Sequence, residues 1–459
     1  MNPGSSPLLT DHYQLMMMQS YLDQGMEETA VFELFVRKLP SCRNFMVAAG
    51  LEQVLDFLEN LTFSPDELAW LATRFQPYFI DYLERFHFNG DVHAMLEGTL
   101  FFPEEPILRI IAPLPQAQLV ESRVMNLLHF QSMIATKAAR SVLMAPGKLL
   151  VDFGMRRAHG AEAALLAARA SYLAGFSGTA TVLAGTLYEI PLFGTSAHSY
   201  IQAHADEDAA LEHFARSYPN NAVLLIDTYD TEAAARKVVT LARKLRVDGI
   251  SIKGVRLDSG DLATHASRVR RMLDEGGLEN TTIFVSGNLD EYRLRALLSP
   301  VGSPPAPIDG FGVGTALDVS SDAPSLDCAY KLQEYAGKAR RKRSEGKATW
   351  PGRKQVYREY DTAEGRMARD IVTLEGEGFH RGEPLIVPVM LKGKRIDEGV
   401  KLDEIRKRTL ASYARLPKPL TILDAASPGY PVEISARLQA LATRLDAETG
   451  AQSLQARAS

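Results

Sequence analysis

The sequence predicts an α/β protein with an irregular parallel β/α barrel and a second α+β domain. Between about residues 147 and 318, short apolar runs alternate with helical segments. Buried parallel strands are continuous apolar runs, and alternation of strands with helices is typical of a parallel sheet. The chain has 459 residues, of which 46% are hydrophobic and 23% charged, so it can fill more than one core.

Composition excludes several classes of protein. The net charge is −5 and the isoelectric point about 6.1, which argues against nucleic-acid and anionic-membrane partners. Two cysteines, Cys42 and Cys328, are too few for a disulfide framework or a four-cysteine zinc site. The first residues lack the pattern of a signal peptide, and no apolar run reaches the roughly 18 residues of a membrane span. We expect a soluble, cytoplasmic protein.

Residues 1–135 are expected to form an N-terminal α+β part. Residues 8–90 are predicted to be largely helical, with Thr10 or Asp11 as the first N-cap and acids after Ser64-Pro65. Short β-like runs follow between about 90 and 115, and 119–144 is predicted to be one long amphipathic helix.

Residues 136–325 are expected to form the barrel. Each predicted strand ends in polar or glycine-rich residues, and the runs are LLVDFG (149–154), ATVLAG (180–185), VLLIDTYD (223–230), GVRLDSGD (254–261), TIFVSGN (282–288) and GFGVGT (310–315). Five or six such units favour a barrel over a short open sheet, and a parallel barrel carries its chemistry at these strand ends. Neither GxGxxG after a first strand nor GxxxxGK[ST] is present, so neither motif supports a nucleotide site.

Residues 326–459 form a C-terminal part that we expect to pack with the N-terminal part. Its segment 338–354 is rich in Lys and Arg. A solvated face, attraction of polyphosphate substrates and nucleic-acid binding are all open for this segment, although aromatic residues between the cations are few.

The strand ends and the turn 190–200 supply the candidate site residues. His198 follows a turn that contains Gly194, Thr195 and Ser196, and such a histidine can be an acid or base, a metal ligand, a phosphoryl acceptor or a purely structural residue. Arg256 can hold a planar carboxylate with its fork, or it forms a solvated ion pair.

The remaining candidates suit ribose, Mg²⁺ and phosphate. Asp258 and Asp261 are candidates for ribose hydroxyls or hydrated Mg²⁺. Gly312 and Gly314 allow backbone amides close to a phosphate, and Thr315 adds a hydroxyl. This inventory suits an anionic, phosphorylated substrate with Mg²⁺, and it suits neither hydride transfer nor zinc hydrolysis.

The motifs in their order resemble those of nicotinate phosphoribosyltransferases. The resemblance runs from about residue 8 to 360 through LLTDHYQLMM, FGMRRAHG, GTSAHS, IDTYDT, GVRLDSGDL, FVSGNLDE, GVGT and YKLQEYAGKARRKRSEGKATWPGRKQVYR. It implies a type II phosphoribosyltransferase-like barrel. It also implies a reaction of nicotinate with 5-phosphoribosyl 1-diphosphate, which gives nicotinate mononucleotide and diphosphate in NAD salvage. ATP is implied as a co-substrate and Mg²⁺ as a cofactor.

The same resemblance implies roles for individual residues. His198 is expected to be the histidine that ATP phosphorylates, and Tyr13, Thr195 and Arg256 to bind nicotinate. Gly312, Gly314 and Thr315 are expected at the phosphoribosyl phosphate. A homodimer with shared active sites is also implied, because family members commonly share active sites between subunits.

Three rival functions stay open on the sequence. A nicotinamide-using relative would need no arginine for a carboxylate. A quinolinate-type enzyme would decarboxylate its substrate and would have no use for a phosphorylated His198. A catalytically silent sensor would bind a nucleotide metabolite without turnover.

Overall fold

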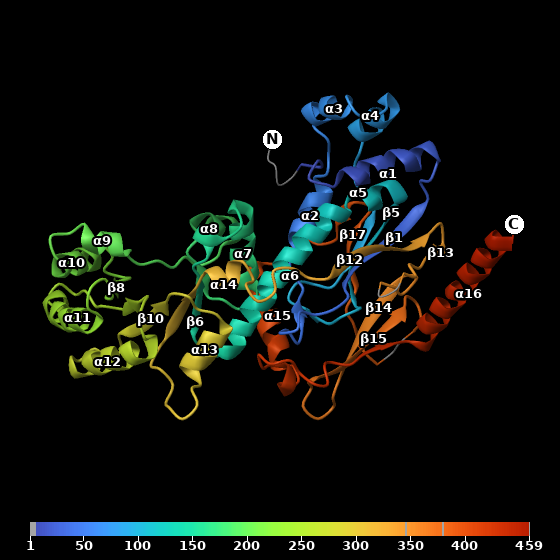
Figure 1. Cartoon of the computed structure of the whole chain (residues 1–459). Helices are drawn as coiled ribbons and strands as arrows, with labels where there is room; N and C mark the ends of the chain where they lie inside the picture. Colours follow the sequence, from blue (N-terminus) through green and yellow to red (C-terminus); the bar gives the residue numbers. More distant parts are fainter. Residues whose placement is uncertain (1–5, 345–346, 379–380, 459) are drawn as a thin grey trace. The chain divides into compact units, whose positions relative to one another are not determined.

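The computed structural model describes residues 6–344, 347–378 and 381–458. The chain divides into two compact units, one made of Met1–Thr136 with Ser325–Ser459 and the other of Lys137–Pro324. We call them the outer unit and the central unit after their places in the sequence. Figure 1 shows their elements.

The central unit is built on a six-stranded sheet in which every neighbouring pair is parallel. Its order is β7-β6-β11-β10-β9-β8. The strands are β6 (Leu149–Asp152), β7 (Gly178–Thr179), β8 (Val223–Leu225), β9 (Gly254–Leu257), β10 (Thr282–Ser286) and β11 (Gly310–Val313). Five of the six predicted runs are therefore confirmed as strands, and the parallel sheet with them.

The predicted barrel is not confirmed. Among the described residues, no ladder joins the edge strands β7 and β8, so closure is not detected. Beyond β7, the described part of the chain adds one isolated bridge to the sheet, between Thr179 and Leu192. The chain between β7 and β8 is mostly helical, which leaves little extended backbone to complete a ladder.

The prediction of a strand at residues 180–185 is wrong. The strand ends at Thr179, and Val182–Tyr188 is helix α8. The apolar residues that suggested a buried strand are largely exposed on this helix, Val182 at 68% and Leu183 at 54%. Their burial was the physical basis of the prediction, and the structure does not bury them.

Helices follow most strands of the central unit, and four of them start at an aspartate. Asp206, Asp230, Asp261 and Asp290 each accept a hydrogen bond from a backbone N–H in the first turn of their helix. Each such cap stabilises a helix start by about 1 kcal/mol. Helices α10, α11 and α12 pack around the β8 and β9 end of the sheet (Figure 1). The helical bounds are η2 (Met155–Arg157), α7 (Ala161–Leu173), α9 (His198–Gln202), α10 (Glu207–Ser217), α11 (Thr231–Arg246), α12 (Leu262–Glu275), α13 (Glu291–Leu298) and α14 (Thr315–Asp318).

The outer unit combines three sheets with helices from both ends of the chain. The largest sheet has the order β13-β12-β1-β5-β3-β17-β18, and a four-stranded sheet has the order β16-β14-β15-β19. Strand β1 pairs with both β5 and β12, so the early and late segments share one sheet. The strands are β1 (Thr29–Val36), β2 (Met46–Val47), β3 (Asp91–Ala94), β4 (Leu100–Phe101), β5 (Pro106–Pro113), β12 (Cys328–Tyr335), β13 (Lys338–Ala339), β14 (Lys354–Tyr360), β15 (Met367–Leu374), β16 (Glu383–Pro384), β17 (Val387–Leu391), β18 (Lys394–Arg395) and β19 (Val432–Ile434).

The helices of this unit agree largely with the sequence prediction. Helix α3 begins at Ser64 with a capping box that includes Glu67. The division between the units, after Thr136, falls within α6. The helices are α1 (His12–Asp23), α2 (Leu51–Glu59), α3 (Pro65–Leu71), α4 (Pro77–Glu84), α5 (Leu114–Leu119), α6 (Glu121–Met144), α15 (Leu402–Ala414), η3 (Lys418–Leu420) and α16 (Ala436–Ala458).

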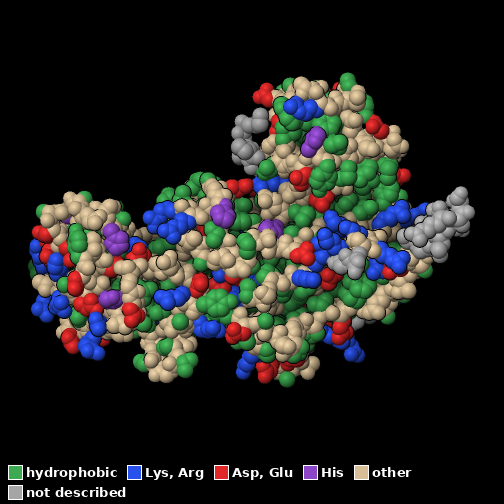
Figure 2. Space-filling model, in the orientation of Figure 1, with side chains coloured by type: hydrophobic (Ala, Val, Ile, Leu, Met, Phe, Trp, Pro, Cys, Tyr) green, Lys and Arg blue, Asp and Glu red, His purple; other side chains and the backbone are tan. Residues whose placement is uncertain are grey.

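Neither the apolar helices nor the surface charges of the described residues point to a particular kind of partner. No helix in the described ranges is both long and apolar enough to cross a bilayer. On the face drawn in Figure 2, acidic, basic and apolar side chains are interspersed on each unit.

Candidate active site

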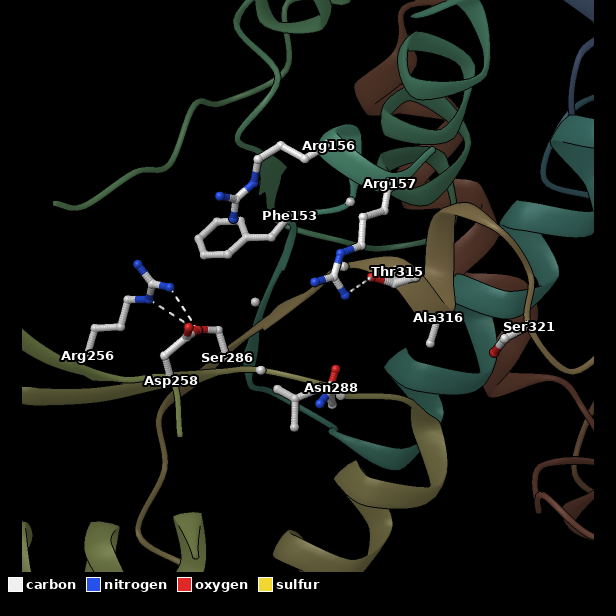
Figure 3. Close-up of a pocket in the computed structure, with 15 residues that line it drawn as sticks. Phe153, Arg156, Arg157, Arg256, Asp258, Ser286, Asn288, Thr315, Ala316 and Ser321 are labelled. Carbon is white, nitrogen blue, oxygen red and sulfur yellow. Dashed lines mark hydrogen bonds and ion pairs between the residues drawn. The ribbon is translucent and has the colours of Figure 1, made fainter. Parts of the chain in front are cut away.

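A cavity of about 610 Å³ lies at the carboxyl ends of β6, β9, β10 and β11 in the central unit. Figure 3 shows Arg256, Asp258 and Ser286 at one end and Arg157 with Thr315 at the other. The Phe153 ring lies between these two groups. Strand ends of a parallel sheet meet at one edge, which is why residues far apart in sequence line one space.

Arg256, at the third position of β9, is held from four sides. Its Nε donates to the Ser286 hydroxyl at 2.9 Å and its Nη2 to Asp258 Oδ1 at 2.8 Å. Its Nη1 donates to Thr195 Oγ1 at 3.0 Å and to the Ser196 carbonyl at 3.3 Å. A guanidinium has five N–H groups, and these contacts use four of them. Within the described residues, one Nη2 hydrogen therefore remains for a ligand.

Asp258 is the acceptor that joins the arginine to the histidine. Burial opposes its ionisation, but hydrogen bonding to Ser286 and the charge of Arg256 outweigh burial, so the pKa of Asp258 lies below its ordinary value. The carboxylate is thus ionised at neutral pH. Its Oδ2 lies 3.9 Å from Nε2 of His198.

His198 is the first residue of α9, and 41% of its side chain is exposed. Its Nδ1 lies 3.1 Å from the Thr228 hydroxyl, just after β8. Thr195 and His198 are not among the cavity-lining side chains. They lie one contact beyond Arg256 and Asp258. The structure therefore brings Thr195, His198, Arg256 and Asp258 into one connected group.

The other end of the cavity is lined by Gly312, Gly314 and Thr315. A Cβ at Gly312 would come within 2.5 Å of the Phe153 ring, so this position needs glycine. Nη1 of Arg157 lies 3.4 Å from the Thr315 hydroxyl. Arg156 also lines the cavity, and Figure 3 draws its guanidinium beside the Phe153 ring, between the two ends.

Two predicted residues lie outside this group. Tyr13 is on α1 of the outer unit, 48% exposed, with its hydroxyl 2.9 Å from Gln14 Nε2. Asp261 is the N-cap of α12, and hydrogen bonds from Thr264 lower its pKa. Asp261 does not line the cavity, and capping is a structural reason for an acid at this position. The ligand roles of both residues stay predictions.

Three residues of the group were given no site role from the sequence, although two of them, Asp227 and Ser286, belong to the polar strand ends that the sequence shows. Phe153 supplies an aromatic face, and Arg256 lies 5.7 Å from its centroid. Ser286 contacts both Arg256 and Asp258. Asp227 accepts hydrogen bonds from Asp258 N at 2.8 Å and from Ser259 Oγ at 2.7 Å. The signal available for each was its position at a strand end.

The arrangement suits a ligand that carries a negative charge at each end and an aromatic ring. A fixed guanidinium with a hydroxyl can orient a carboxylate, and glycine turns with arginines can hold a phosphate. Neither end offers a thiol nucleophile. Within the described residues, no three His, Cys, Asp or Glu side chains are grouped as a metal cage.

Comparison with known proteins identifies the family. Residues 8–129 match the nicotinate phosphoribosyltransferase N-terminal domain, and residues 149–348 match the nicotinate phosphoribosyltransferase family. Nicotinate phosphoribosyltransferase pncB2 of Mycobacterium tuberculosis is 46% identical over 441 residues, which cover 95% of this chain and 93% of that protein. The chain belongs to the nicotinate phosphoribosyltransferase family. This confirms the resemblance of the motifs.

Further relatives cover most of the chain as well. Nicotinate phosphoribosyltransferase of Bacillus subtilis is 39% identical, with 81% of this chain and 77% of that protein covered. The crystal structure of human nicotinic acid phosphoribosyltransferase superposes with a TM-score of 0.84 at 28% identity, over 95% of this chain and 99% of that one. A nicotinate-nucleotide pyrophosphorylase from Pyrococcus furiosus has a TM-score of 0.72 at 26% identity, with 90% and 96% covered.

Proposed function

We propose that this protein joins nicotinate to 5-phosphoribosyl 1-diphosphate, giving nicotinate mononucleotide and diphosphate in NAD salvage. The observation that carries the proposal is the fixed Arg256, which lines the end of the cavity away from Gly312 and Gly314 and is bonded to Thr195 just beyond the lining. Membership of the nicotinate phosphoribosyltransferase family supports the same activity.

The nicotinate carboxylate would bind at the Arg256 end. The spare Nη2 hydrogen is the first donor available to it. The Thr195 hydroxyl is the second, because it accepts from Arg256 and donates only weakly, to the Ser196 carbonyl at 3.3 Å. Phe153 offers its ring to the face of the pyridine. The pyridine nitrogen already carries a lone pair, so the reaction needs no strong general base to create the nucleophile.

The phosphoribosyl group would bind at Gly312, Gly314 and Thr315. Departure of diphosphate from C1 leaves an oxocarbenium-like sugar, which the pyridine nitrogen attacks. The chain's part in this step is to orient two anions and to offset the charge of the leaving group, for which Arg156 and Arg157 are placed.

The acidic residues fit the Mg²⁺ that the family implies. Mg²⁺ is usually held by one or two carboxylates together with substrate phosphates and water. Asp258 is ionised, and Asp227 has a buried Oδ1 without a hydrogen-bond partner within the described residues. These two would hold the ion, and Asp261 is a further candidate. Mg²⁺ would supply positive charge to the diphosphate.

His198 would couple the reaction to ATP. Its imidazole would take the γ-phosphoryl group, breaking the bond to the bridging oxygen and releasing ADP. Water would later take that group from the ring as inorganic phosphate. Thr228 and Asp258, on either side of the ring, would fix its orientation. Such coupling makes the enzyme ligase-type in its energetics.

The oligomer is part of the proposal. We infer a homodimer with shared active sites, as the family resemblance implies. Tyr13 is a predicted nicotinate residue, but it lies far along the chain from Arg256 and does not line the Arg256 cavity, so the second copy would supply it. Sedimentation velocity of the full chain would test this state directly. A monomer that is fully active would contradict it.

The test of the function is product formation with labelled ATP. Nicotinate, 5-phosphoribosyl 1-diphosphate and Mg²⁺ are expected to give nicotinate mononucleotide, faster with ATP. With γ-³²P-labelled ATP, an acid-labile label is expected on the wild type and on His204→Gln, but not on His198→Gln. His204 is the matched control because it lies just beyond the same short helix. Absence of product in folded protein would overturn the function, and a label that persists in His198→Gln would overturn the phosphohistidine.

A further inference from the structure

Two carboxyl groups meet beneath the phosphate end of the cavity. Asp152 closes β6 and is 0% exposed, and Asp318 closes α14 and is 1% exposed. Both carboxyl groups lie against Gly154, because Asp152 accepts a hydrogen bond from its N–H and a Cβ built at this glycine would lie 2.1 Å from the Asp318 carboxyl carbon. They join two of the turns that line the cavity, the one that follows β6 and the one between β11 and α14.

Asp152 has the surroundings of an ionised acceptor. Its Oδ1 accepts from the Gly154 N–H at 2.8 Å and its Oδ2 from the Thr179 hydroxyl at 2.7 Å. Thr179 in turn accepts from the Thr181 N–H at 3.0 Å. The carboxylate therefore holds the start of the glycine turn and the end of β7 together.

Asp318 has the surroundings of a neutral acid. Within the described residues, neither carboxyl oxygen of Asp318 accepts a hydrogen bond. In the same part of the chain, neither Asp318 nor Asp152 forms an ion pair with a Lys, Arg or His side chain. Burial raises the pKa of Asp318 well above its ordinary value, and the charge of Asp152 raises it further. As an acid, Asp318 would gain a partner, because its O–H would then be able to donate to the neighbouring Asp152 carboxylate.

The contact with the turn is close. A Cβ built at Gly154 would lie 2.1 Å from the Asp318 carboxyl carbon, so the acid packs directly on the Gly154 backbone. Gly154 and Thr315 both line the cavity, and the Asp318 N–H bonds the Gly314 carbonyl at 3.2 Å. Loss of the acid would free both turns at the place where a phosphate would bind.

We propose that Asp318 is a positioning residue that, as a neutral carboxylic acid, clamps the Asp152 turn to the α14 turn and so shapes the phosphoribosyl site. This inference rests on the proposed function for the identity of the ligand. A shared proton also keeps the pair at one negative charge instead of two, which limits repulsion of a phosphate above it.

The test compares two substitutions of one residue. Asp318→Asn keeps the shape and a donor toward Asp152, whereas Asp318→Ala removes both. Asp309→Ala is the matched control, because Asp309 precedes β11 at the opposite end of the same strand and is exposed. Calorimetry would measure binding of 5-phosphoribosyl 1-diphosphate with Mg²⁺ to the full chain. Hydrogen exchange of the free chain would follow peptides that contain residues 153–157.

We expect Asp318→Ala to weaken binding at least about tenfold and to speed exchange in this turn, because small displacements of a site are costly. Asp318→Asn and Asp309→Ala should stay within about threefold of the wild type. Wild-type behaviour of Asp318→Ala would overturn the clamp. Asp318→Asn as weak as Asp318→Ala would show that an anion or a metal ligand is needed, and would overturn the neutral acid.

Calorimetry and hydrogen exchange together distinguish a failure of this inference from a failure of the proposed function. A wild-type chain that binds no 5-phosphoribosyl 1-diphosphate would overturn the function and the site that Asp318 is said to shape. Hydrogen exchange would still decide whether the acid pair holds the turn. A wild-type chain that binds the ligand, with unchanged exchange and affinity in Asp318→Ala, would overturn the clamp alone.

Discussion

Replacing Arg256 by glutamine perturbs the nicotinate end of the cavity most directly. The side chain is 14% exposed and makes hydrogen bonds to Thr195, Ser196, Asp258 and Ser286. Glutamine keeps a polar group of shorter reach but removes the positive charge. The nicotinate carboxylate would then lose its only charge-assisted donor among the residues assigned to it.

The expected loss follows from the contacts. A hydrogen bond to a charged group contributes about 1.5–3 kcal/mol, and leaving Asp258 without its cation adds to the cost. A total near 3 kcal/mol corresponds to roughly 100-fold, since about 1.4 kcal/mol is tenfold. Arg256→Lys should lose less, about tenfold, because the charge stays while the planar fork is lost.

Steady-state kinetics with each substrate varied in turn would measure the effect. We expect the KM for nicotinate to rise roughly 100-fold in Arg256→Gln, with a smaller change for 5-phosphoribosyl 1-diphosphate. Arg268→Gln is the matched control, since Arg268 is a 60% exposed arginine on α12. A folded Arg256→Gln variant whose KM for nicotinate lies within twofold of the wild type would refute the assignment. A loss confined to 5-phosphoribosyl 1-diphosphate would move Arg256 to the phosphate.

Three further predictions concern other parts of the central unit. His198→Ala should make nicotinate mononucleotide at a rate that no longer rises with ATP, and an ATP response in initial rates would contradict this. Glu291→Ala removes the buried carboxylate shared by Lys137 and Arg140, so urea unfolding should show a loss of about 3–5 kcal/mol; a loss below 1 kcal/mol would be inconsistent with that pairing. The raised pKa of Asp318 means that its contribution to stability is complete below about pH 4 and falls as the pH rises toward the raised value. Asp318→Asn should flatten that fall in unfolding free energy, and equal slopes would count against it.

The parallel sheet was predictable because buried strands leave a strong local signal. Five apolar runs, each ended by polar or glycine residues, became β6, β8, β9, β10 and β11. The run at 180–185 has the same composition but lies on an exposed helix, and composition alone does not report exposure.

Strand β1 is the reverse case, a strand in a region that the sequence predicted to be helical. It lies within 8–90, which was predicted to be largely helical, and nearly all of its residues are buried. A short continuous apolar run does not separate strand from helix by periodicity. Its partner β12 lies at the far end of the sequence, so the pairing that fixes it is invisible locally.

Some residues of the candidate site were also predictable from the sequence, and some of its contacts were not. Arg256, Asp258 and Thr315 follow from the rule that strand ends meet at one edge. The contacts of Thr228 with His198 and of Asp318 with Asp152 depend on how helices α9 and α14 pack, which no spacing in the sequence states. The sequence around Asp152 does not state its pairing with Asp318, which depends on the burial of both acids.

A competition between three pyridines tests the central claim most directly. Nicotinate, nicotinamide and quinolinate would be mixed in equal amounts with the protein, 5-phosphoribosyl 1-diphosphate and Mg²⁺, with and without ATP, and the mononucleotide products weighed by mass spectrometry. Because Arg256 and Thr195 suit one carboxylate, we expect nicotinate mononucleotide as the main product, in larger amount with ATP. Nicotinamide mononucleotide as the main product, or no product from folded protein, would contradict the proposed function.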